Sequence, residues 1–189
     1  MPPLVGGDDA WAEVRLSPRP AGPAVIALAG DWNAMPRKPR LQSTGQVAYQ
    51  KAAAQVLAER GLGRAKVKVL QVIRIDLEGD GIEEALFAAG NLDPAHPRSA
   101  CRPGDYSFVA IRRLVGGAVR TQVLVGDFHK AADETRAPTH SQVAAVLDLN
   151  GDGTMEVVTS GQYFWGAGLD VWALQGGSLK RVLEGWVED

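Results

Sequence analysis

Two short acidic loops carry the residue types in this chain that are best suited to hold a metal ion. Residues 76–84 read DLEGDGIEE and residues 148–156 read DLNGDGTME, and each stretch follows an apolar run. Both place oxygen-bearing side chains at positions 1, 3 and 5 and a glycine at position 6, a spacing that curls a chain around a hard cation such as calcium. The repetition favours metal binding over the alternative, a solvated acidic turn, because carboxylates this dense repel one another when no cation is bound.

The residues that follow exclude a calcium site of the helix–loop–helix type. Such a loop needs a bidentate acidic side chain at position 12, and that position is Phe87 in the first stretch and Thr159 in the second. The flanking residues are β-branched and typical of strands. We therefore expect the ion to be structural: it would fix a turn between two strands, neutralise the carboxylates and set the strand register.

Other residues that could act in catalysis are few and scattered. His96, His129 and His140 lie in loop-like segments without the helical spacing of a metal site, and the sequence contains neither a nucleophile elbow nor a phosphate-binding glycine loop. Asp127 and His129 supply acid and base groups. A small metal-assisted hydrolase that uses this pair or the acidic loops is therefore the alternative function, although a polar connector between repeats is the favoured interpretation. Cys101 is the only cysteine, which excludes an intrachain disulfide and a cysteine-based zinc site.

Aromatic residues outside the expected strands are candidates for a ligand surface. They are Trp32, in a proline-rich loop, and Tyr163, Phe164 and Trp165, in a connector over residues 163–168. Aromatic side chains supply large contact areas at low entropy cost, so these groups could bind a glycan or a peptide. The alternative is that they cap the ends of the core, and Trp172 and Trp186 are expected to be core residues.

Composition sets the class of protein. The chain has 189 residues, 46% of them hydrophobic and 22% charged, which is typical of a folded globular protein with its own core. The net charge of -2 gives no indication of nucleic acid or an anionic membrane surface as a partner. No apolar stretch reaches the roughly 18 residues of a membrane span. The first residues also lack the regions of a signal peptide, so a leader for export would be absent from this chain.

The elements that must position the loops begin with an N-terminal segment of mixed character. Residues 24–29 (AVIALA) form an apolar run stopped by Gly30, which predicts a buried strand. Residues 31–40 contain two prolines and are predicted to be a loop, because proline fits neither a helix interior nor a central strand.

A helix is predicted over residues 44–60. Ser43 and Gln46 match a capping box, and Gly61 supplies a stop. Four apolar residues fall broadly on one face of this helix: Val47, Ala48, Val56 and Leu57.

Each acidic loop belongs to a longer repeated pattern of strand, loop, strand and hairpin. The strands expected in the first copy are 66–75, 85–89, 106–114 and 119–125. Those expected in the second copy are 143–147, 157–160, 169–174 and 179–183. Each hairpin turns on a Gly-Gly pair, Gly116-Gly117 or Gly176-Gly177, since such turns need positive φ. The first copy is longer because of residues 91–104, which we expect to be a surface insertion.

The two copies resemble the integrin-like FG-GAP or VCBS calcium repeats of β-propeller proteins, in which a loop of this kind joins the first two strands of a blade. The resemblance covers residues 66–126 and 141–184, and the acidic loops are its specific part. For the first site it implies the side chains of Asp76, Glu78, Asp80 and Glu84 and the carbonyl of Ile82. For the second site it implies the side chains of Asp148, Asn150, Asp152 and Glu156 and the carbonyl of Thr154. The ninth position is Glu where the repeats usually have Asp, and Glu78 is also longer than the usual residue.

These patterns predict a mainly β (α+β) fold with two four-stranded antiparallel, blade-like units. A propeller needs at least about four blades, so two cannot close. We expect the N-terminal strand and helix to cover the open β face; the alternative is association through exposed strand edges. The expected parts are an N-terminal segment over 1–64, a first repeat over 65–126, a linker over 127–140 and a second repeat over 141–189, together one compact domain.

The function expected from these observations is a calcium-binding, non-enzymatic β-repeat module with a protein or glycan ligand. If its affinity resembles that of extracellular calcium modules, with Kd on the order of 10⁻⁴ to 10⁻³ M, the setting is extracytoplasmic: periplasmic, cell-surface or secreted.

Overall fold

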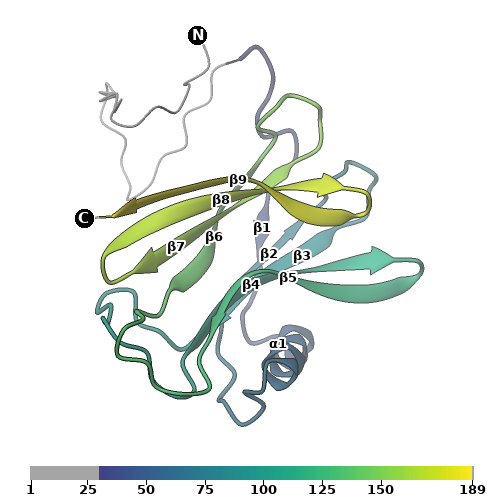
Figure 1. Cartoon of the computed structure of the whole chain (residues 1–189). Coiled ribbons are helices and arrows are strands. Elements are labelled where there is room, and N and C mark those ends of the chain that lie inside the picture. The colour runs from purple at the N-terminus through teal and green to yellow at the C-terminus, as the bar shows by residue number, and fades with distance from the viewer. Residues whose placement is uncertain (1–29, 189) are drawn as a thin grey trace.

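The computed structural model describes residues 30–188, which form two antiparallel sheets and one α-helix (Figure 1). The chain is therefore mainly β, as predicted. The strand predicted at residues 24–29 lies outside the described residues. Within residues 30–188, no helix combines the length and the apolar character needed to cross a membrane.

The first sheet contains five strands in sequence order, each antiparallel to the next. They are β1 (Arg40–Leu41), β2 (Val69–Ile75), β3 (Glu84–Gly90), β4 (Tyr106–Val115) and β5 (Ala118–Phe128). The second sheet contains four strands in the same arrangement. They are β6 (His140–Leu147), β7 (Glu156–Tyr163), β8 (Gly166–Gln175) and β9 (Ser178–Glu188). Strands β2 to β5 thus correspond to β6 to β9. The prediction of four strands in each unit is wrong for the first sheet, because β1, at the end of the predicted 31–40 loop, pairs with the edge of β2.

The two hairpins turn where the sequence predicts. Gly116 and Gly117 have φ of 59° and 78°, and Gly176 and Gly177 have φ of 58° and 80°. Two successive positive φ angles match the right-handed twist of the flanking strands, and only glycine adopts them without strain. Both hairpins extend from the same side of the molecule (Figure 1).

Helix α1 spans Val47–Glu59, within the predicted range, and the chain leaves it through Gly61 at φ 79°. The predicted capping box is wrong: Gln46 is the N-cap and makes no side-chain capping bond. Ser43 lies three residues before the N-cap, and its hydroxyl accepts a hydrogen bond from the N–H of Gly45 instead.

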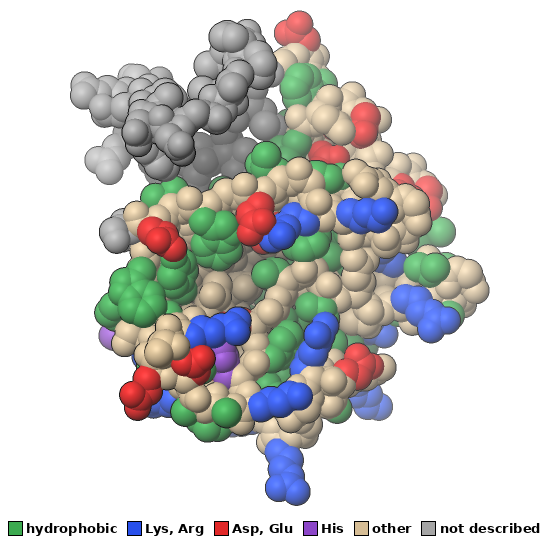
Figure 2. Space-filling view, in the orientation of Figure 1, with side chains coloured by type: hydrophobic (Ala, Val, Ile, Leu, Met, Phe, Trp, Pro, Cys, Tyr) green, Lys and Arg blue, Asp and Glu red, His purple; other side chains and the backbone are tan. Residues whose placement is uncertain are grey.

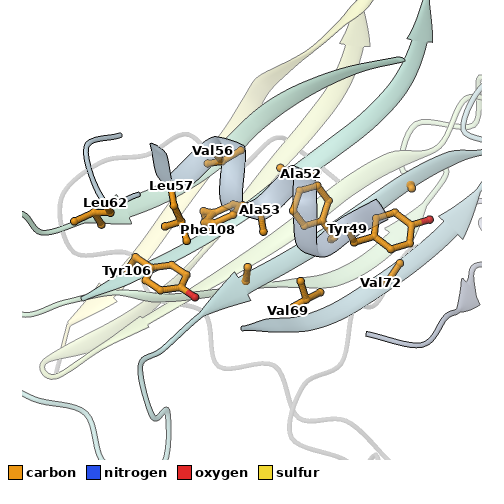
Figure 3. Close-up of a cluster of buried hydrophobic side chains, with 14 residues drawn as sticks. Tyr49, Ala52, Ala53, Val56, Leu57, Leu62, Val69, Val72, Tyr106 and Phe108 are labelled. Atoms are coloured by element: carbon orange, nitrogen blue, oxygen red, sulfur yellow. The ribbon is translucent and has the colours of Figure 1, made fainter. Parts of the chain in front are cut away.

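The apolar face predicted for this helix is half wrong. Val47 is 66% exposed and Ala48 is also exposed, because the helix rests on the sheet through a different stripe. The buried residues of α1 are Tyr49, Ala52, Ala53, Val56 and Leu57. Figure 3 shows these side chains over strand residues that include Val69, Val72 and Phe108.

The first sheet lies between the helix and the second sheet (Figure 1). One core cluster joins α1 to the sheet face that carries Phe87, Tyr106 and Phe108. A second cluster joins the opposite face, with Leu86 and Ile111, to residues of the second sheet. The helix therefore covers one face of the first sheet, as expected, and the second sheet covers the other.

Three details differ from the sequence-based expectations. Strand β7 was predicted to end before Gly161, but it continues through this residue. The ring of Trp186 packs against Gly161, and a Cβ at this position would lie 2.7 Å from the ring. Trp186 is not a core residue but 40% exposed, because it lies on the edge strand β9; Trp172 is partly buried against the core. In the 91–104 insertion, Cys101 is buried and pairs with Asp133 by a β-bridge, so the insertion is not entirely a surface loop.

Candidate metal-binding loops

The two acidic loops lie side by side at one end of the molecule. The first joins β2 to β3, the second joins β6 to β7, and both are at the upper end of Figure 1. The N–H of Met155 donates to the carbonyl of Leu77 at 2.9 Å. Both of these side chains are buried in the core between the sheets. Packing of the sheets therefore brings together two loops that are 72 residues apart in the sequence.

The two loops repeat the same backbone geometry. The carboxylate of Asp76 accepts hydrogen bonds from the N–H groups of Gly79 at 2.6 Å and Gly81 at 2.9 Å. The carboxylate of Asp148 accepts the equivalent bonds, from the N–H groups three and five residues later, at 2.7 and 2.9 Å. The four loop glycines have φ between 78° and 84°, and they are Gly79, Gly81, Gly151 and Gly153. Each loop thus curls around its first carboxylate.

A buried glutamate closes each loop from the start of the following strand. Glu84 and Glu156 are both 4% exposed. Their carboxylates accept hydrogen bonds from the N–H groups of Leu77 at 3.0 Å and Leu149 at 2.8 Å. The ninth position therefore folds back against the second position of the same loop.

The surroundings of these two glutamates shift their pKa values upward. Burial raises the pKa of Glu156, and the hydrogen bond from the Leu149 N–H acts in the opposite direction. Repulsion from the carboxylates of Asp152 and Asp148 adds to the effect of burial. Burial also raises the pKa of Glu84, where the Leu77 N–H and Arg113 act in the opposite direction. In the second loop, two neighbouring carboxylates thus add to the effect of burial on Glu156.

The middle positions of the loops are exposed and form short local hydrogen bonds. Asp80 and Asp152 each accept from the N–H group two residues later, at 2.8 and 2.7 Å. In the second loop the amide of Asn150 also donates to Asp152 at 3.0 Å, so positions 3 and 5 are in contact. In the first loop Glu78 forms an ion pair with Arg113 at 2.8 Å.

A short segment, residues 32–37, lies across both loops. The indole N–H of Trp32 donates to the carbonyl of Asp148 at 2.9 Å, and its ring lies over Gly151, where a Cβ would be 3.1 Å from it. The N–H of Asp148 donates to the carbonyl of Ala34 at 2.9 Å. Trp32 is 37% exposed, and it lies at the opposite end of β7 from the other aromatic candidates.

Arg37 joins the two loops directly. Its guanidinium donates to the carbonyls of Asp76 at 2.6 Å and Leu77 at 2.9 Å in the first loop, and to the carbonyl of Gly153 at 2.6 Å in the second. No local pattern signals its role, because its partners are 39 to 116 residues away in the chain.

The oxygen donors suit calcium in kind, and the structure shows them engaged with the backbone. Across residues 30–188, no three acidic, histidine or cysteine side chains converge on a point that could hold an ion. The second loop offers carboxylates of Asp148, Asp152 and Glu156 and the amide oxygen of Asn150, which are the hard ligands that calcium takes. The carboxylates of Asp148 and Asp152 help to raise the pKa of Glu156, and a bound cation would act against that repulsion.

The Asp127 and His129 pair forms a buried polar cluster. Their side chains contact each other at 2.8 Å, and Asp127 also accepts from Arg136 at 2.8 Å and from the N–H of Thr139 at 2.9 Å. Both residues are 6% exposed. The cluster therefore ties the 127–140 linker to the end of β5. The other two histidines lie elsewhere: His96 is exposed and pairs with Asp93 at 2.9 Å, and His140 begins β6.

Aromatic side chains gather at the end of the second sheet that is remote from the acidic loops. Phe164 and Trp165 form the turn between β7 and β8 and are 48% and 43% exposed. The Tyr163 ring lies 6.3 Å from that of Trp165 and 5.9 Å from that of Trp186. A cavity of about 360 Å³ borders this group, with Arg136 also in its wall. Three of the four predicted aromatic residues are thus together, joined by Trp186, which was expected in the core.

Comparison with known proteins adds no assignment. The chain matches no protein-family model, no curated protein and no solved structure.

Proposed function

We propose that the protein is a calcium-stabilised, non-enzymatic binding module built from two blade-like units of the FG-GAP or VCBS kind. The observation that carries this proposal is the repeated geometry of the acidic loops. In each, the first carboxylate accepts from two glycine N–H groups and a buried glutamate closes the loop. A loop of this form between adjacent strands suits a structural ion, which would be held by the oxygens of positions 1, 3, 5 and 9 and the carbonyl of position 7.

A bound calcium ion would supply positive charge where the fold has concentrated carboxylates. The contribution of the protein is to fix the loop in advance: positive-φ glycines set the turn, and the 32–37 segment holds the second loop through Trp32 and Ala34. An ion there would stabilise the contact between the two sheets, because both loops meet at the point where the sheets pack.

A binding role fits the remaining surface better than catalysis does. Asp127 and His129, the acid and base groups of the alternative hydrolase, are buried and engaged with each other and with Arg136. The exposed aromatic group of Tyr163, Phe164 and Trp165 offers instead a contact surface for a protein or glycan ligand. Weak, millimolar-range calcium sites are suited to an extracytoplasmic setting, which we propose for this protein.

Thermal unfolding in calcium, in magnesium and in a chelator tests the proposal. Calcium at 100 times its Kd would stabilise the folded protein by about 2.7 kcal/mol, which corresponds to an increase in Tm of roughly 5–10 °C for a chain of this size. Asp152→Ala should lose most of this increase. Glu134→Ala, which removes an exposed linker carboxylate, should retain it. Equal Tm values in calcium and in chelator would refute the proposal.

A further inference from the structure

The two acidic loops differ in the cation that accompanies them. We propose that Arg113 is a built-in cation for the first loop and that only the second loop, residues 148–156, takes a divalent ion. This inference rests on the proposed calcium function and assigns its stoichiometry.

Arg113 contacts two of the four predicted side-chain ligands of the first loop. It lies on β4, and its guanidinium donates to Glu78 at 2.8 Å and lies 3.9 Å from the carboxylate of Glu84. These are the third and ninth positions of the loop. Its side chain is only 9% exposed, so its charge acts in a weakly screened environment. A divalent ion at the same positions would have to displace the guanidinium and compete with its charge.

The second sheet holds Arg113 in place. The guanidinium also donates to the carbonyl of Gly177 at 3.0 Å, at the turn of the β8–β9 hairpin. Arg113 therefore bridges the first acidic loop and the neighbouring sheet. An ion pair that is fixed by a third partner loses less side-chain entropy than a free surface pair does.

The corresponding position of the second repeat carries no charge. Ala85 pairs with Arg112 across β3 and β4, and Val157, at the equivalent place after the second loop, pairs with Trp172 across β7 and β8. The residue after Trp172 is Ala173, the counterpart of Arg113. Among the described residues, no lysine or arginine forms an ion pair with Asp148, Asp152 or Glu156, whereas ion pairs do form at Glu78 and Glu84.

The two loops differ in which ligand positions already have a cationic partner. The first loop has carboxylates at all four side-chain positions, and Arg113 partly neutralises them. The second has three carboxylates, with Asn150 at the third position, and a methyl group at Ala173 where the first has its guanidinium. Four carboxylates less one guanidinium leave the ligand positions of the first loop with the same net charge as the three carboxylates of the second. The loops therefore differ in position: Arg113 already pairs with the third- and ninth-position carboxylates of the first loop, and within residues 30–188 no such partner lies at those positions of the second, which leaves them to an external cation.

Calcium titration calorimetry of chelator-stripped protein tests this inference through the number of ions bound. The parent should bind one ion, Arg113→Ala should bind two, and Ala173→Arg should bind none. Arg120→Ala is the matched control, because Arg120 lies opposite Arg113 on β5 and is exposed. It should bind one ion, as the parent does.

Two further variants identify the occupied loop without altering Arg113. Glu156→Gln should abolish binding in the parent background and Glu84→Gln should leave it intact, which keeps the test decisive if Arg113→Ala does not fold. Three outcomes would overturn the inference while the calcium function stands. They are two ions bound by the parent, one ion bound by a folded Arg113→Ala variant, or loss of binding in Glu84→Gln but not in Glu156→Gln. If neither the parent nor Arg113→Ala binds calcium, the calcium function itself is overturned.

Discussion

Arg37 shows how one side chain can hold two repeats together. Its guanidinium donates to two carbonyls of the first acidic loop and one of the second. Hydrogen bonds from a charged donor are stronger than those between neutral groups. Without Arg37, these carbonyls would need hydrogen bonds from water instead. A positive charge here also lies beside the acidic loops without occupying any of the predicted ligand positions.

Arg37→Met should lower the free energy of unfolding by about 1–3 kcal/mol, because it removes several charge-assisted hydrogen bonds while keeping the apolar stem. Lys38→Met is the matched control, since Lys38 is the exposed neighbour with the same charge. We expect it to change stability by no more than about 0.5 kcal/mol. Urea unfolding of both variants measures the difference, and equal values for the two would contradict the bridging role of Arg37.

At the scale of elements, local sequence patterns predicted most of the fold. Alternating β-branched runs predicted the strands, and Gly-Gly pairs predicted both hairpin turns. The capping box and half of the apolar helix face were wrong, because a local pattern cannot show which stripe of α1 meets the sheet. Trp186 was misassigned for a similar reason: a large apolar residue on an edge strand packs over Gly161 and Gly168 without being covered itself.

The orientation of α1 can be tested with two of its apolar residues. Leu57 is 1% exposed and Val47 is 66% exposed. Leu57→Ala leaves a cavity against the first sheet and should cost about 2–5 kcal/mol, whereas Val47→Ala should change stability by less than about 0.5 kcal/mol. Chemical denaturation of both variants gives the comparison. Similar losses for the two would mean that the helix presents its other face to the sheet.

At the scale of the whole molecule, the arrangement of three layers explains where the candidate site lies. The helix covers one face of the first sheet, the second sheet covers the other, and the acidic loops meet at the end of that contact. Figure 2 shows acidic side chains toward the upper right of the molecule, where Figure 1 places the loops, and basic side chains mainly across the lower half.

The candidate ligands could be predicted because each set lies within a stretch of nine residues. The side chains that hold the loops in place could not be predicted. Trp32, Arg37 and Arg113 reach the loops only through the packing of the chain. Each makes a hydrogen bond to a residue 35 or more positions away in the chain. Their roles follow from the contact between the sheets and have no local signature.

Terbium luminescence tests most directly whether the second loop holds a calcium-type ion. Terbium replaces calcium at oxygen sites and emits when a nearby tryptophan is excited, and Trp32 lies against this loop through its bond to Asp148 and its contact with Gly151. We expect excitation of tryptophan to produce terbium emission that excess calcium abolishes. The emission should be weak in Trp32→Phe and absent in Asp148→Asn. Emission that persists in excess calcium, or that is unchanged in Asp148→Asn, would contradict a calcium site in this loop.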